Sequence, residues 1–207
     1  MIPFYKHNLT SKNYIKKTLK SFYLTSGPKC EEVENILKKR FNKKFSYLTN
    51  SWTNAAIAIL LALKIKKGDE IIIPACTFVA CANIIEIVGA KVVFADIDPK
   101  TKLMDINDCL KKITKKTKAI MPVHLYGNLF PTFVLKRKIR KNIFIIEDSA
   151  HAFSGEYNNR PLGFYADFLI FSFYATKSIT CGEGGAILSN NKKNIEKIRS
   201  IANNGMS

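Results

Sequence analysis

Residues 168–189 read FLIFSFYATKSITCGEGGAILS, two apolar runs joined by a glycine-containing loop. The runs Phe168–Phe173 and Ala186–Ser189 are short and rich in aliphatic and aromatic residues, which is typical of strands in a buried sheet. The connection between them has no helical pattern, so we expect the sheet to change strand direction at this place. Lys177 leaves the end of the first run and enters the glycine-rich turn.

Five earlier segments resemble strands in composition, and segments of helical spacing lie between them. The expected strands are Phe45–Leu48, Glu70–Ile73, Lys91–Ala95, Ala119–Pro122 and Ile143–Glu147, and the expected helices are Thr53–Leu63, Ala80–Val88, Ile106–Ile113 and Thr132–Arg140. Strands that alternate with helices predict an α/β fold in which helices flank a mostly parallel, mixed sheet.

The N-terminal region has a different pattern. Two helices are expected, Ser11–Phe22 and Glu31–Phe41, separated by a turn at Thr25–Pro28. We therefore expect residues 1–44 to form a helical arm, packed against the main sheet or a neighbouring subunit. Residues 45–207 are expected to form one large domain that ends with a helix over Asn190–Ala202.

The composition is that of a globular protein, with 47% hydrophobic residues and a net charge of +17 over 207 residues. The lysines are dispersed, often as pairs at element ends, and no aromatic residues interleave with a basic run, which argues against a nucleic-acid surface. The charge is interpreted either as compositional drift towards lysine or as a field that attracts an anionic nucleotide-sugar or an acidic partner. The apolar runs are shorter than a membrane span, and no secretory signal is recognisable, so we expect a cytoplasmic protein without membrane contact.

The five cysteines form no CxxC pair and lie far from the three histidines. This arrangement argues against a disulfide framework and against a zinc site. We expect incidental thiols in a reducing compartment and no bound metal.

Three segments at expected strand ends are candidates for binding. Residues 50–56, which open a helix, could bind a phosphate with their backbone N–H groups and the Thr53 hydroxyl, or Ser51 or Thr53 could simply cap the helix. Phe78 could stack on an aromatic ligand or belong to the core. Asp148 could stabilise a buried cation or cap a strand end; with only His151 nearby, a metal ion is poorly supported.

Lys177 is the fourth candidate. Apolar surroundings disfavour the charged form of a lysine, and the neutral amine is a nucleophile that can form a Schiff base. Taken alone, Lys177 would be read as a surface lysine. A phosphate loop, an aromatic ring, a carboxylate, a hydroxyl and a lysine are, however, the parts that a pyridoxal 5'-phosphate (PLP) site needs, with the acid at the ring nitrogen.

Five motifs resemble the DegT/DnrJ/EryC1/StrS family of PLP-dependent nucleotide-sugar aminotransferases. They are Leu24–Lys29, Gly68–Pro74, Pro122–Gly127, Glu147–His151 and Ser172–Gly185, and the resemblance runs from Ile2 to Met206. It implies a type I PLP-transferase large domain. The implied activity is transfer of an amino group from glutamate to a nucleotide-linked keto sugar, expected to be a UDP-linked 4-keto sugar, for surface polysaccharide or glycan biosynthesis.

The resemblance also implies roles for seven residues. Lys177 would bind the cofactor aldehyde and later move the proton, while Asp148 would pair with the pyridinium nitrogen. The other implied cofactor contacts are Thr53, the Trp52 backbone and Ser172 at the phosphate, Phe78 on one ring face, and His151 on the other side or near the substrate.

Two residues and the length depart from the family pattern. Trp52 is bulkier than the residue that many members carry, and Tyr174 stands where many have a histidine. Family members are about twice as long, so the C-terminal small domain and the residues lent to a partner in a homodimer are expected to be missing. This leaves open a non-catalytic relic, or a binding subunit that pairs with a full-length relative. A PLP-dependent dehydratase of the same fold is disfavoured, because that branch replaces the lysine.

Overall fold

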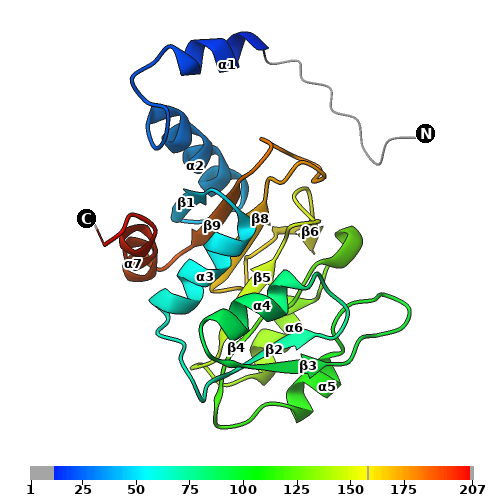
Figure 1. The fold of residues 1–207 in the computed structure, drawn as a ribbon. Helices are drawn as coiled ribbons and strands as arrows, with labels where there is room; N and C mark the ends of the chain where they lie inside the picture. The colour runs from blue at the N-terminus through cyan, green and yellow to red at the C-terminus, as the bar shows by residue number, and fades with distance from the viewer. Residues whose placement is uncertain (1–11, 158, 206–207) are drawn as a thin grey trace, which may run out of the picture.

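The computed structural model describes residues 12–157 and 159–205, and Figure 1 shows them as a central sheet with helices around it. The main sheet has seven strands in the order β1-β9-β8-β5-β4-β2-β3. Its strands are β1 (Phe45–Thr49), β2 (Glu70–Pro74), β3 (Lys91–Ala95), β4 (Thr117–Ile120), β5 (Phe144–Asp148), β8 (Phe168–Ser172) and β9 (Gly185–Ser189). A two-stranded hairpin, β6 (Glu156–Tyr157) and β7 (Arg160–Pro161), lies outside it.

The helices connect these strands and cover the sheet. They are α1 (Lys12–Leu19), α2 (Pro28–Arg40), α3 (Trp52–Ala62), α4 (Ala80–Ile87), α5 (Ile106–Lys111), a 3-10 turn η1 (Leu125–Gly127), α6 (Thr132–Lys138) and α7 (Lys192–Ala202). None of the helices in residues 12–157 and 159–205 is long and apolar enough to cross a bilayer.

Strand direction follows the pattern expected from the sequence. Neighbouring strands pair in parallel from β8 through β5, β4 and β2 to β3. The strand β9 pairs antiparallel with both β8 and β1. The predicted α/β fold with a mostly parallel mixed sheet is therefore confirmed, including the reversal after Phe173.

Side chains of β8 alternate between two packed layers. Phe168 and Ile170 join the larger core cluster, which also contains side chains of α3 and α7. Leu169 and Phe171 point to the other face and pack in a second cluster with Leu37 and Phe41, from α2 and its C-terminal end. Because both faces of this strand are covered, it is apolar throughout, as expected for a buried strand.

Several element boundaries differ from those predicted. The helix α2 begins at Pro28, which had been expected in the preceding turn; proline fits the first helical position, where no N–H donor is needed. The strand β4 ends at Ile120, since Pro122 has no N–H with which to extend the ladder. The final helix starts at Lys192, because the Asn191 side chain caps it by accepting a hydrogen bond from the Asn194 N–H at 3.1 Å.

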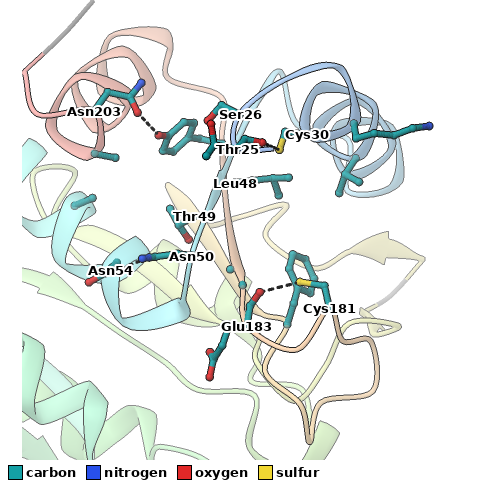
Figure 2. A pocket seen from close by; sticks show the side chains of 18 of the residues that line it. Thr25, Ser26, Cys30, Leu48, Thr49, Asn50, Asn54, Cys181, Glu183 and Asn203 are labelled. Atoms are coloured by element: carbon teal, nitrogen blue, oxygen red, sulfur yellow. Dashed lines mark hydrogen bonds between the residues drawn. The ribbon is translucent and has the colours of Figure 1, made fainter. Parts of the chain in front are cut away.

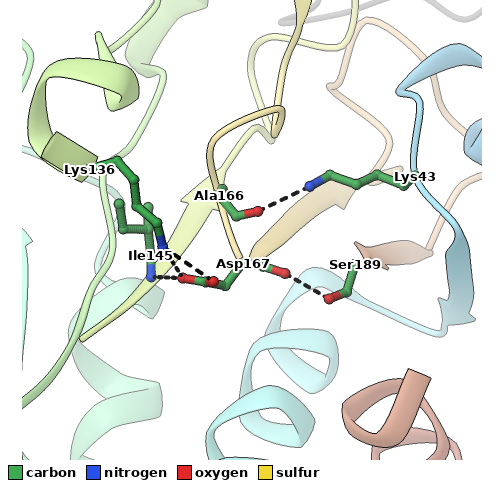
Figure 3. Close-up of polar contacts among 6 residues, drawn as sticks. All are labelled: Lys43, Lys136, Ile145, Ala166, Asp167 and Ser189. Atoms are coloured by element: carbon green, nitrogen blue, oxygen red, sulfur yellow. Dashed lines mark hydrogen bonds and ion pairs between the residues drawn. The ribbon is translucent and has the colours of Figure 1, made fainter. Parts of the chain in front are cut away.

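A polar network ties the amino ends of neighbouring strands together (Figure 3). The Asp167 carboxylate accepts hydrogen bonds from the Ile145 N–H at 2.8 Å and from the Lys136 ammonium at 3.2 Å. The Asp167 carbonyl accepts from the Ser189 hydroxyl at 2.7 Å, and the buried Lys43 ammonium donates to the Ala166 carbonyl at 3.0 Å. This network fixes the edge of the sheet opposite to the carboxyl ends of β5 and β8.

The expected arm corresponds to α1 and α2, which stand at one end of the molecule, with α2 beside β1 (Figure 1). Its link to the rest of the chain includes a hydrogen bond from the Leu48 N–H to the Glu34 carboxylate at 3.0 Å. The beginning of the predicted first helix lies outside the described residues, and the division of the chain at residue 44 stays a prediction.

Candidate active site

A cavity of about 430 Å³ lies at the carboxyl ends of the strands. Its walls come from the start of α3, the segment between β2 and α4, the segment after β5, and the loop that follows β8. All seven side chains singled out in the sequence line this one cavity: Trp52, Thr53, Phe78, Asp148, His151, Ser172 and Lys177. Ligands of open α/β sheets bind at this edge, where the loops converge.

The N-terminus of α3 forms one wall of the cavity. The Ser51 hydroxyl caps the helix by accepting a hydrogen bond from the Asn54 N–H at 3.1 Å. No described residue accepts a hydrogen bond from the N–H groups of Trp52 and Thr53, so these donors and the positive end of the helix dipole suit an anion. Capping and anion binding, which were alternatives in the sequence, are thus compatible.

Gly185 allows β9 to pass close to this helix start. A Cβ atom there would lie 2.7 Å from both the carbonyl carbon and the carbonyl oxygen of Ser51. Any side chain would have to push the Ser51 backbone away. The glycine therefore helps to place the N–H groups of α3 beside the end of β8, where Ser172 lies.

Asp148 ends β5 and is buried. Its Oδ1 atom accepts hydrogen bonds from the Ala150 N–H and from the Trp52 indole N–H, each at 3.0 Å. Burial raises the pKa of Asp148, while the Ala150 N–H, the Cys81 thiol and the charges of His151 and Lys177 oppose the rise. Among the described residues no cation lies within ion-pair distance of the carboxylate, so it retains the capacity to pair with a cationic ligand.

Lys177 lies on a loop that is closed by hydrogen bonds. The Phe173 carbonyl accepts from the Cys181 N–H at 3.1 Å and from the Thr180 hydroxyl at 3.0 Å, and the Phe173 N–H donates to the Gly184 carbonyl at 2.8 Å. The Lys177 side chain is half-buried, and burial lowers the pKa of its amine although the charge of Asp148 opposes the shift. A lowered pKa increases the neutral, nucleophilic fraction of the amine.

Phe78 and His151 form the exposed rim of the cavity. The Phe78 side chain is 71% exposed, so it is not the core aromatic that the sequence left as an alternative. His151 accepts a hydrogen bond at Nδ1 from the Tyr126 N–H at 3.3 Å, and the two rings stack with centroids 6.0 Å apart. Tyr126 itself has a left-handed backbone (φ 55°), which is costly for a residue with a side chain and often marks a functional region.

A larger cavity, of about 860 Å³, lies behind the loop on the side of the helical arm (Figure 2). It is lined by α2, β1, α3, the end of α7 and the loop around Cys181, and it shares Glu183 and Gly184 with the first cavity. Neither Asp148 nor Lys177 borders it. The smaller cavity is therefore the candidate active site, because Asp148 and Lys177 line it together.

Two features of the site were missed in the sequence. Trp52 was expected to contribute its backbone alone, yet its buried indole reaches Asp148. Cys81 was interpreted as an incidental thiol, but its Sγ atom lies 3.5 Å from Asp148 Oδ2 and 3.3 Å from the Thr77 hydroxyl. No local sequence signal reveals these contacts, since they join residues 96 and 67 positions apart.

Sequence and structure comparisons find relatives among sugar aminotransferases. The GDP-perosamine synthase of Escherichia coli O157:H7 is 38% identical over 195 residues, which make up 92% of this chain and 54% of the synthase. A Streptococcus pneumoniae protein described as a sugar aminotransferase, solved in a PMP form, superposes with a TM-score of 0.85 and 34% identity over 90% of this chain and 52% of its own. An aminotransferase of pseudoaminic acid biosynthesis from Helicobacter pylori superposes with a TM-score of 0.86 and 31% identity over 93% of this chain and 53% of its own.

The chain thus spans about half the length of the relatives that it matches. The S. pneumoniae protein has also been solved in a PLP form, so the cofactor predicted from the sequence is one that a structural relative binds. The model of the DegT/DnrJ/EryC1/StrS aminotransferase family matches residues 7–207. The chain belongs to the DegT/DnrJ/EryC1/StrS aminotransferase family.

Proposed function

We propose that this chain provides the cofactor-binding half of a PLP-dependent aminotransferase that moves an amino group from glutamate to a nucleotide-linked keto sugar. One observation carries the proposal: a lysine and a buried carboxylate, from the ends of two neighbouring strands, line one cavity together with the N-terminus of a helix. The family and its relatives support the same activity.

The residues around the cavity fit PLP in their chemistry. The unpaired N–H groups of Trp52 and Thr53, with the hydroxyls of Thr53 and Ser172, suit the phosphate. The buried Asp148 carboxylate suits a protonated ring nitrogen, since it has no ion-pair partner among the described residues. A cavity of about 430 Å³ falls within the range that small-molecule sites occupy, roughly 300–1,000 Å³.

When bound, PLP supplies an aldehyde carbon and an electron-withdrawing ring. Lys177 would hold the cofactor through its amine, and in the reaction its Nζ atom would move a proton between the substrate carbon and the aldehyde carbon of the cofactor. The lowered pKa of this amine suits both tasks near neutral pH. Asp148 would keep the ring nitrogen protonated, while Phe78 would cover one ring face and His151 would lie on the other side or near the substrate.

The net charge of +17 favours an anionic nucleotide-sugar. The UDP-linked 4-keto sugar expected from the sequence stays a prediction, as do the role in polysaccharide biosynthesis and a cytoplasmic location. One relative is named for a GDP-linked sugar and another was solved with a TDP-sugar product, so the nucleotide differs between these proteins.

We also propose that a second copy of the chain, or a full-length relative, covers the arm. Large apolar side chains on it are exposed: Ile15, Leu19, Phe22, Tyr23, Leu24, Val33 and Ile36. An exposed group of this kind is typical of an interaction surface. A monomeric mass in light scattering, together with no association with a full-length relative, would contradict this expectation.

The experiment for the proposed function is cofactor trapping at Lys177. The chain is purified with PLP, its visible absorbance is recorded, and borohydride reduction followed by peptide mapping locates the attachment. Lys177→Ala should abolish the reducible absorbance, whereas Lys115→Ala, at an exposed lysine before β4, should leave it unchanged. If Lys177→Ala stays as yellow and as reducible as the wild type, the assignment of Lys177 is wrong.

A further inference from the structure

Trp52 lies at the first position of α3, and its side chain is only 8% exposed. The indole packs within the main core cluster, while its N–H donates to Asp148 Oδ1 at 3.0 Å. An indole N–H can only donate, so this contact is satisfied by an acceptor such as a carboxylate oxygen. The buried ring therefore connects the start of α3 directly to the acid at the end of β5.

The two oxygens of Asp148 have unequal surroundings. Oδ1 accepts two hydrogen bonds, from the Trp52 indole and from the Ala150 N–H, both at 3.0 Å. Oδ2 has the Cys81 thiol at 3.5 Å, and a thiol is a weak donor. Because a carboxylate oxygen has about two lone-pair sites, Oδ1 is fully used and the remaining acceptor capacity lies on Oδ2.

An alternative is that the Trp52 ring obstructs the cavity. Its packing in the main core cluster and its low exposure argue against this. The cavity of about 430 Å³ also remains open past the indole, bordered by Thr53, Phe78 and Lys177.

We propose that Trp52 is a positioning residue for Asp148: with the Ala150 N–H it holds Oδ1, so that Oδ2 is left to accept the ring N–H of PLP. This inference rests on the proposed function for its last step. The hydrogen bond by which the indole holds Asp148 does not depend on the proposed function, and it can be tested on the chain without cofactor.

Three titratable groups act on Asp148, one from each neighbouring segment. Cys81 on α4 stays protonated, since burial raises the pKa of its thiol. His151 follows β5, and burial lowers the pKa of its imidazole. Lys177 follows β8, and its positive charge favours the ionised form of Asp148. Trp52 differs from all of these in having no titration of its own.

The first test uses the fluorescence of the single tryptophan in the sequence. As the pH is lowered without cofactor, protonation of Asp148 should change the emission of Trp52, with a midpoint above the ordinary aspartate value of 3.8. Asp148→Asn should remove this transition, and His151→Gln should retain it. If Asp148→Asn titrates as the wild type does, the indole does not report on Asp148 and the inference is overturned.

The second test measures PLP binding to Trp52→Phe, which keeps an aromatic ring but lacks the donor. Affinity should fall about tenfold, as expected for one hydrogen bond to a charged group. The loss of affinity on acidification should also begin at higher pH, because without this donor the pKa of Asp148 rises further. Cys81→Ala, which removes only the weak donor at Oδ2, should have a smaller effect.

The outcomes separate the two proposals. Equal or tighter PLP binding by Trp52→Phe, or a pH profile that superposes on the wild type, would overturn the positioning role. A purely structural role would weaken binding without moving the profile. If the wild type binds no PLP, the proposed function fails, while the fluorescence titration still decides whether Trp52 holds Asp148. Circular dichroism of each variant confirms that it is folded, and the fluorescence test does not depend on Trp52→Phe.

Discussion

Two carboxylates at opposite ends of the parallel strands, the partly buried Asp167 at the amino edge and the buried Asp148 at the carboxyl edge, have opposite surroundings. At the amino edge the Asp167 carboxylate accepts hydrogen bonds from the Ile145 N–H and the Lys136 ammonium. The Asp167 carbonyl accepts one from the Ser189 hydroxyl (Figure 3). At the carboxyl edge Asp148 is more deeply buried but has no cation within ion-pair distance among the described residues. The Asp167 carboxylate at the amino edge is therefore satisfied within the chain, whereas Asp148 at the carboxyl edge keeps acceptor capacity for a ligand.

This difference indicates where stability and function are located. A buried carboxylate without a cationic partner destabilises the folded chain, because desolvation is not repaid by an ion pair. Such groups are retained at sites where a ligand supplies the missing charge. The satisfied contacts at the amino edge contribute stability and leave no atom free for chemistry.

The largest effect is expected from Asp148→Asn, which removes the charge and keeps the shape. PLP affinity should fall about 100-fold, which corresponds to the roughly 2.7 kcal/mol of a strong charged hydrogen bond. The free energy of unfolding without cofactor should stay equal or rise, since an uncompensated charge is removed. Absorbance titration with PLP and urea unfolding measure the two quantities. A clearly less stable variant with unchanged PLP affinity would break the comparison.

A smaller effect is expected from Asp167→Ala at the amino edge, and here stability should fall while PLP affinity does not. The Ile145 N–H loses its acceptor, and an unsatisfied buried donor costs about 1–3 kcal/mol of stability. PLP affinity should be unchanged, because the network lies at the far edge of the sheet. Lys136→Ala is the matched control: it removes only a partly exposed ion pair, which contributes less than about 1 kcal/mol. If both variants lost the same free energy of unfolding in urea, the contact with the Ile145 N–H would not be the source of the loss.

Much of the fold could be predicted from local patterns, because each strand carries its own apolar run. The segment Lys91–Ala95 is found as predicted, and the reversal after Phe173 followed from the missing helix. The lateral order of strands could not be predicted, since pairing such as β1 with β9 joins segments far apart in the chain. The hairpin β6–β7 was missed because two residues per strand give no periodicity.

The site was predictable in its parts and less so in its connections. Asp148 and Lys177 were indicated by their places at strand ends, and the structure brings both to one cavity. The contact of the Trp52 indole with Asp148 depends on how α3 packs against β5, which no local pattern encodes. A side chain that was noted only for its bulk, and expected to contribute its backbone, instead supports the acid.

The smallest effect is expected in the pH dependence of stability, where two adjacent carboxylates should act with opposite sign. Burial raises the pKa of Glu147, but the neighbouring His124 (Nε2 to Oε2, 3.3 Å) and the Gly163 N–H outweigh it and leave the pKa below its ordinary value. Glu147 therefore contributes stability that is lost as the pH falls through its folded pKa.

Asp148 has a raised pKa, so its contribution is fully present below 3.8 and is lost as the pH rises through its folded value. In the difference between Asp148→Asn and wild type without cofactor, Glu147 and the other groups whose pKa does not depend on Asp148 cancel. The stability advantage of the variant should therefore grow as the pH rises from below 3.8 towards neutrality, which urea unfolding at several pH values can measure. A difference that is constant with pH would mean that Asp148 is already compensated within the chain, and the contrast between the two edges of the sheet would disappear.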